Sequence, residues 1–264
     1  MKHMLLAVWA YRFFIISSIK TEFKSRFARS KLGGLWMVLH PLAQVLVYAL
    51  ILSQIMTAKL PGVATQYAYP VYILSGMVGW TLFAEVLNKS LMVFISNGNL
   101  LKKMAFPKLA LPLITIGEAL INFIIFLVMM FIVFGFLGHL PYHALHWLPV
   151  LTLISLSLAI GIGLFLGTLN VFIRDIGQFM EVVLNFWFWL TPVVYMISIV
   201  PEKYHALFML NPMTGIVMGY QNVLLYDKAP NLHLLIYPSI VALVSLTLAM
   251  VVFYKAREEM ADVL

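Results

Sequence analysis

Cysteine is absent from the chain, and charged residues are scarce. Without cysteine the chain can form neither a disulfide nor a thiolate metal site. Charged side chains make up 10% of the 264 residues and hydrophobic side chains 63%, against about 25% and 45–50% in an ordinary soluble domain. A soluble fold of this length could not cover so much apolar surface, so lipid must be the solvent for much of the chain.

Several functional patterns are missing as well. There is no glycine-rich loop ending in Lys-Ser or Lys-Thr, which excludes that mode of ATP binding. Arg12 interrupts the first apolar run and no small-residue cleavage site follows, so we expect no signal peptide. A metal could be held by His139, His143 and His146, but no carboxylate lies near them in their loop. We therefore expect a solvated loop and no metal site.

Six apolar segments are long enough to cross a hydrocarbon core of about 30 Å at about 1.5 Å per residue. Residues 1–32 are cut too short by Arg12 and Lys20, and we expect a helix in the membrane interface there, with a partly disordered tail as the alternative. The predicted fold is an all-α integral membrane protein, a single transmembrane domain over 1–264. The six spans are expected at about 35–57, 70–94, 110–137, 147–172, 177–199 and 235–254.

The segment between the fifth and sixth spans is too interrupted to cross the membrane. It holds Pro201, Pro212 and Pro230 together with several polar groups. We therefore divide the chain into a basic N-terminal segment, five spans, this interrupted segment, and the last span with its tail, with boundaries at 1–32, 33–199, 200–234 and 235–264.

Lysine and arginine are distributed unevenly between the two sides of the predicted membrane. Thirteen of the 17 fall on the side that holds both termini and three on the other. Since basic residues flank the cytoplasmic ends of spans, both termini are expected in the cytoplasm. The net charge of +7 is then explained by the lysines and arginines that orient a membrane protein. We therefore expect no nucleic-acid partner.

The second span carries charged residues on one side and aromatic residues on the other. Glu85 and Lys89 are four residues apart, the spacing of an ion pair on a helix, and we expect this pair to be structural. At about 100° per residue, a narrow arc on the opposite side holds Tyr72, Gly76, Trp80 and Phe83.

Two other spans carry polar or aromatic stripes. Aromatic faces stack on the C–H surfaces of sugars and polar groups bond to hydroxyls, so three stripes together favour a conduit for a sugar chain. For any single ring, helix packing and the aromatic belts of the membrane interface are the alternative. The two stripes are Gln178, Glu181, Asn185 and Trp189 on the fifth span, and Trp36, His40, Gln44 and Tyr48 on the first.

The fourth span carries a pair of small residues instead. Gly163 and Gly167 are four residues apart, which indicates helix packing.

Several motifs follow one another in order over nearly the whole chain. The first span begins with Arg29-Ser-Lys-Leu-Gly-Gly-Leu-Trp36 and Pro41-Leu42. Asn99-Leu-Leu-Lys-Lys103 and Phe106-Pro-Lys108 follow, then Leu111-Pro112. Later landmarks are Phe172-Ile-Arg-Asp-Ile176, Thr191-Pro-Val-Val-Tyr195 and Asn211-Pro212. In this order they resemble the permeases of polysaccharide-exporting ABC transporters, and among these most closely the permeases that export O-antigen.

The resemblance implies a homodimer in the bacterial inner membrane, paired with two copies of a separate ATPase subunit that binds the ATP and Mg. It also implies re-entrant periplasmic helices in 200–234. The first, second and fifth spans would line a channel for a lipid-linked polysaccharide, with Trp36, Gln44, Tyr48, Tyr72, Trp80, Phe83, Glu181, Asn185 and Trp189 as the lining. The loop after the second span would contact the ATPase through Asn99, Lys102, Lys103, Phe106, Pro107 and Lys108.

Three alternatives remain open. Export of capsule or teichoic acid would use the same architecture. An ABC exporter subunit for a lipid or small molecule would show fewer aromatic stripes. A membrane-embedded lipid-modifying enzyme would need clustered histidine and aspartate near one membrane face, and only Arg174-Asp175 comes close. We therefore expect no catalytic residues in this chain.

Overall fold

A computed structural model describes residues 11–27, 35–47, 67–98, 110–257 and 259–263. Within these residues the chain is helical and contains no strand, which confirms the all-α prediction. The helices are α2 (Arg12–Phe27), α3 (Trp36–Leu46), α5 (Ala68–Ser96), α7 (Ala110–Phe136), η3 (Leu145–Trp147), α8 (Leu148–Phe172), α9 (Asp175–Trp189), η4 (Ile197–Ile199), α10 (Glu202–Met209), α11 (Pro212–Leu224), α12 (Leu232–Ala256) and α13 (Met260–Val263).

Four helices are long and apolar enough to cross a membrane: α5, α7, α8 with its η3 turn, and α12. They coincide with the predicted second, third, fourth and sixth spans. Only the first part of the predicted first span is described, as α3, and its remainder from 48 to 57 lies outside the described residues. Six spans therefore stay a prediction, of which four are confirmed as helices of sufficient length.

The fifth span is shorter than predicted. We expected a helix over 177–199, but α9 ends at Trp189 and the chain turns until η4 begins at Ile197. The cause is Pro192, because proline has no amide hydrogen to donate and disfavours helical geometry in the residue before it. At about 1.5 Å per residue α9 is about 22 Å long, which is shorter than a hydrocarbon core of about 30 Å.

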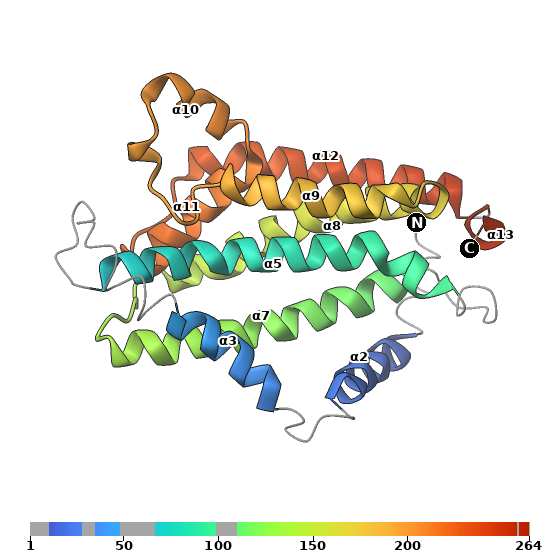
Figure 1. The fold of residues 1–264 in the computed structure, drawn as a ribbon, viewed down its shortest axis with the longest axis horizontal. Helices are drawn as coiled ribbons and strands as arrows, with labels where there is room; N and C mark the ends of the chain where they lie inside the picture. Colours follow the sequence, from blue (N-terminus) through green and yellow to red (C-terminus); the bar gives the residue numbers. More distant parts are fainter. Residues whose placement is uncertain (1–10, 28–34, 48–66, 99–109, 258, 264) are drawn as a thin grey trace.

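Helix α5 is the centre of the bundle (Figure 1). Of its 29 residues 21 are buried, and it packs against α8, α7 and α11. The approach of α8 is close, because a Cβ on Gly163 would lie 2.7 Å from the Ser90 Cβ and one on Gly167 would lie 2.5 Å from the Ser90 carbonyl oxygen. These contacts confirm that the glycine pair serves helix packing.

The two ends of the bundle collect different connections (Figure 1). One end holds the start of α7, the turn between α8 and α9, and α13. The opposite end holds the loop from α7 to α8, together with α10 and α11. Arg174, Lys255 and Arg257 therefore share the first end, as the predicted topology requires, although their cytoplasmic orientation stays a prediction.

The N-terminal and interrupted segments are helical where they are described. Helix α2 packs on α7, with Ile19 against Gly117. Its position in the membrane interface stays a prediction. Between α9 and α12 the chain forms the short helices α10 and α11, with Pro201 just before α10 and Pro212 as the first residue of α11. The segment 200–234 thus contains short helices separated at its prolines, and the re-entrant position of these helices in a membrane stays a prediction.

Candidate functional site

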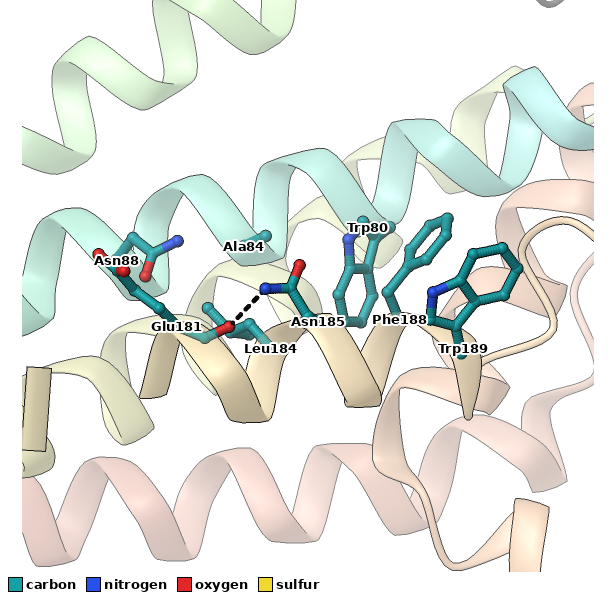
Figure 2. A pocket seen from close by; sticks show the side chains of 8 residues that line it. All are labelled: Trp80, Ala84, Asn88, Glu181, Leu184, Asn185, Phe188 and Trp189. Carbon is teal, nitrogen blue, oxygen red and sulfur yellow. Dashed lines mark hydrogen bonds between the residues drawn. The ribbon is translucent and has the colours of Figure 1, made fainter. Parts of the chain in front are cut away.

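Helices α5 and α9 line an open cavity of about 420 Å³ (Figure 2). Residues spaced three or four apart on a helix share one face, so each helix presents a continuous wall to the other. Helix α5 contributes three of the lining residues and α9 contributes five. They are Trp80, Ala84 and Asn88, and Glu181, Leu184, Asn185, Phe188 and Trp189.

Polar and aromatic side chains occupy different parts of the cavity (Figure 2). Asn88, Glu181 and Asn185 lie toward the end where α9 begins, whereas the aromatic rings lie toward the end where α9 stops. Asn185 donates its Nδ2 hydrogen to the Glu181 carbonyl oxygen of its own helix at 3.0 Å. Such a site can accept and donate hydrogen bonds at one end and stack rings at the other.

The aromatic end is a connected set of rings. Trp80 meets Phe188 edge to face with ring centroids 5.4 Å apart, and Phe188 meets Trp189 in the same way at 5.4 Å. Trp80 also contacts Phe83 of its own helix, with ring centroids 5.7 Å apart and the rings tilted. Trp189 keeps 64% of its surface exposed, against 7% for Trp80, so it offers the largest open ring.

The structure brings together four of the predicted lining residues: Trp80, Glu181, Asn185 and Trp189. Two others on α5 do not line this cavity. Phe83 is fully buried with its ring 5.0 Å from that of Trp187, and the Tyr72 hydroxyl donates to the backbone at 3.0 Å. Asn88 and Phe188 line the cavity but were not predicted. Asn88 could have been predicted from the sequence, because Trp80, Ala84 and Asn88 are each four residues apart and therefore share one face of α5.

The remaining predicted residues lie away from the cavity or outside the described part of the chain. Trp36 is exposed on α3, where its ring tilts against His40, and α3 packs on α7. The Gln44 side chain and Tyr48 are not described. The same holds for the expected ATPase-contact residues Asn99, Lys102, Lys103, Phe106, Pro107 and Lys108.

A short connecting segment, residues 190–196, follows α9 beyond the aromatic end of the cavity and is called the strap here; polar side chains from α5 and α11 hold it in place. Its carbonyl oxygens are the acceptors, since a turn leaves them without helical partners. Tyr69 and Tyr72 on α5 donate their hydroxyls, and the buried Gln221 on α11 donates its amide. The acceptors are the carbonyl oxygens of Val194 at 2.5 Å, Tyr195 at 3.0 Å and Pro192 at 3.0 Å.

Asn211 joins the strap to α9 and α11. Its Oδ1 accepts from Trp187 Nε1 at 2.7 Å and caps α11 by accepting from the Met213 amide at 2.9 Å. Its Nδ2 donates to Thr191 Oγ1 at 2.8 Å and to the Leu190 carbonyl oxygen at 3.2 Å. One side chain thus uses four hydrogen bonds to fix the helix end that carries the aromatic rings.

On the opposite face of α5, the predicted ion pair is confirmed and enlarged. Lys89 Nζ lies 2.9 Å from Glu85 Oε1 and 3.3 Å from Glu118 Oε2 of α7. Asn122 of α7 donates its Nδ2 hydrogen to Glu85 Oε1 at 2.5 Å. The pair therefore belongs to a four-residue cluster that joins α5 to α7. We did not predict the two α7 members of the cluster. The sequence indicates them through the spacing of Glu118 and Asn122, which are polar and four residues apart on an otherwise apolar span.

At the opposite end of the bundle from Arg174, the histidine loop does have a carboxylate partner, contrary to our expectation. Asp227 has a positive φ of 49°. It accepts from His143 Nδ1 at 2.7 Å and from the amides of residues 142–144. Desolvation alone would raise the pKa of Asp227, but these hydrogen bonds hold it well below its ordinary value. Among the described residues no group of three His, Cys, Asp or Glu side chains is placed to bind a metal.

Comparison with known proteins gives the chain its relatives. It is 29% identical over 257 residues to the O-antigen export system permease protein RfbA of Myxococcus xanthus, covering 97% of this chain and 96% of that protein. A protein of the same name from Klebsiella pneumoniae is 25% identical over 249 residues, covering 92% of each chain. The polysialic acid transport protein KpsM of Escherichia coli is 22% identical over 239 residues, covering 90% of this chain and 91% of that one.

The family pattern agrees with these relatives and with the apolar helices of the fold. The ABC-2 type transporter family matches residues 14–225. This range includes α5, α9 and the whole cavity between them. The resemblance to permeases of polysaccharide-exporting ABC transporters is thereby confirmed. Because the match takes in most of the sequence, this chain belongs to the ABC-2 type transporter family.

Proposed function

We propose that this chain is the channel-forming permease subunit of an ATP-driven exporter that moves lipid-linked polysaccharide of the O-antigen type across the bacterial inner membrane. The observation that carries the proposal is the cavity between α5 and α9, which combines aromatic rings with amides and a carboxylate in an ABC-2 permease. Sugars offer C–H faces for the rings and hydroxyls for the polar groups. The chain itself supplies a path and performs no bond chemistry.

The exposed face of α9 supports a homodimer. Gln178, Glu181 and Asn185 are exposed along α9, which packs on its own chain mainly through Gly177, Met180 and Leu184. Polar groups facing lipid are costly and normally turn toward a protein partner or a water-filled cavity. Two copies that face each other across α9 would enclose a polar path between them, with one cavity on each side.

The energy must then come from a separate subunit. We propose two copies of an ABC ATPase that bind ATP and Mg, docked on the end of the bundle where α5 stops and α7 begins. This end would be cytoplasmic, with both termini. The loop 97–109 would be the contact, with Lys102 and Lys103 against acidic groups and Phe106 as an apolar anchor. Phe106→Ala changes no charge, and we expect it to leave the protein inserted while cutting transport or loosening the ATPase.

The test of the proposed path is export by variants of the aromatic end. Trp189→Ala removes an exposed ring from the cavity wall, and we expect surface polysaccharide to fall while the protein level stays normal. Trp80→Ala should lower export as well, but because Trp80 is 7% exposed its loss also destabilises the core, so export is measured per folded permease. The matched control is Phe136→Ala, because Phe136 is 88% exposed at the end of α7, away from the cavity. Normal export by the Trp80→Ala, Trp189→Ala double variant would assign both rings to packing.

A further inference from the structure

Among the described residues, the lining of the cavity between α5 and α9 holds one acidic group and no basic group. Within this lining, as far as the structure describes it, Glu181 is the single charged side chain, and the other polar groups are the amides of Asn88 and Asn185 and the indole N–H groups of Trp80 and Trp189. Lysine and arginine bind carboxylates and phosphates in most anion sites, and neither is present among the described lining residues. The described lining therefore carries a net negative charge from Glu181.

Two of the polar side chains in the cavity, Glu181 and Asn88, can still form hydrogen bonds with a ligand. Within the described residues the Glu181 carboxylate has neither an ion-pair partner nor a hydrogen-bond donor, and the Asn88 amide has no hydrogen bond. Both are exposed, and both lie at the same end of the cavity (Figure 2). A carboxylate accepts hydrogen bonds only, whereas an amide accepts and donates them. This combination matches the hydroxyl groups of a neutral sugar.

Lys89, the residue next to Asn88, forms ion pairs away from the cavity. Lys89 follows Asn88 in the sequence but points to the other side of α5, where it binds Glu85 and Glu118 at 2.9 and 3.3 Å. Its partners hold it against α7, so it does not neutralise Glu181. The negative charge of the described cavity lining thus comes from Glu181 on α9. Two copies facing each other would bring two such carboxylates to one path.

We propose that this polar end selects for uncharged glycans and disfavours glycans that carry carboxylates or phosphodiesters, with Asn88 as a further substrate-contacting residue. The inference rests on the proposed export function and names the substrate class of the same site. Like-charge contact at a few ångströms, in surroundings between water and protein interior, gives roughly a tenfold discrimination. Rings of acidic side chains act in the same way in channels that exclude anions.

The experiment uses cells that lack their own exporter and carry this chain with its ATPase subunit. Two lipid-linked polymers are supplied in turn, a neutral hexose polymer and a matched polymer with one uronic acid in each repeat, and surface glycan is measured per permease. We expect the neutral polymer to be exported about tenfold faster. Glu181→Gln should lower this ratio toward one, and Asn88→Asp, which adds a carboxylate, should raise it further.

The matched control is Asp175→Asn, which removes a carboxylate from the first turn of the same helix but outside the cavity lining. Its ratio should equal that of the unaltered chain. Equal export of both polymers by the unaltered chain would overturn the inference and leave the export function standing. A ratio that neither Glu181→Gln nor Asn88→Asp shifts would also overturn it. Export of neither polymer, with the ATPase bound, would instead refute the proposed function.

Discussion

Replacing Lys89 with methionine tests the four-residue cluster between α5 and α7. Methionine keeps an unbranched apolar side chain but removes the ammonium group from two carboxylates at once, Glu85 at 2.9 Å and Glu118 at 3.3 Å. Glu85→Gln is the milder change, because Lys89 keeps Glu118 and the Asn122 amide can still donate to the oxygen of the new side chain. We therefore expect Lys89→Met to be the more destabilising of the two.

The structure sets the size of the effect. Losing one partner of a fully buried ion pair costs about 3–5 kcal/mol. The three side chains are 14–30% exposed, which reduces the cost of Lys89→Met to about 1–3 kcal/mol. Glu85→Gln should cost about 1 kcal/mol or less, the scale of an exchanged hydrogen bond. For a chain of this size 1 kcal/mol shifts Tm by about 2–4 °C, so a cost of about 1–3 kcal/mol should lower the Tm of Lys89→Met by roughly 2–12 °C.

The assay is thermal unfolding of the purified protein in detergent, with folded protein in the membrane as the second readout. Lys203→Met is the control, because Lys203 lies on α10 over the Tyr204 ring and has no carboxylate partner among the described residues. A simple pair of Glu85 and Lys89 would predict equal losses for the two single variants and recovery in the double variant. Equal Tm values for Glu85→Gln and Lys89→Met, or recovery in the double variant, would refute the cluster.

Three further predictions follow from other contacts. Asn211→Ala should lower Tm by several degrees and change the fluorescence of the α9 tryptophans, since it removes four hydrogen bonds, including a helix cap worth about 1 kcal/mol; an unchanged spectrum would contradict this. Asp227→Asn should speed hydrogen exchange in the α7–α8 loop at pH 7. Because the pKa of Asp227 is depressed, the stabilisation that it gives is present at neutral pH and is lost as the pH falls through the acid range, and the variant should lack this dependence. Gly163→Ala should destabilise by about 1–3 kcal/mol through overpacking against Ser90, whereas Gly135→Ala, whose new Cβ meets no atom within 4 Å, should not.

Much of the architecture could be predicted because it depends on local sequence. Apolar runs gave the positions of the four long helices to within a few residues. The helical wheel correctly separated the faces of α5, since Glu85 and Lys89 contact α7 while the aromatic arc turns to α9 and the strap. The early end of α9 was also available in the sequence, but the apolar run after Pro192 concealed it.

The rest depends on contacts between distant segments. Nothing local shows that Phe83 would be covered by Trp187, or that Tyr72 would donate to a carbonyl 123 positions away. The partnership of His143 with Asp227 joins loops 84 residues apart. A stripe on one helix therefore predicts which residues share a face, whereas only the packing of the other helices decides which of them remain open.

The burial of α5 has a consequence for the synthesis of the protein. It is the least apolar of the four long helices, and it carries Glu85 and Lys89. The insertion machinery resists charged side chains at the bilayer centre by about 2.5–3.5 kcal/mol each. Their partners lie on α7, whose last residue follows that of α5 by 40 positions, which is roughly 2–8 s of translation at about 5–20 residues per second. We therefore expect α5 to stay beside the insertion machinery during that interval and to enter lipid only when α7 follows it.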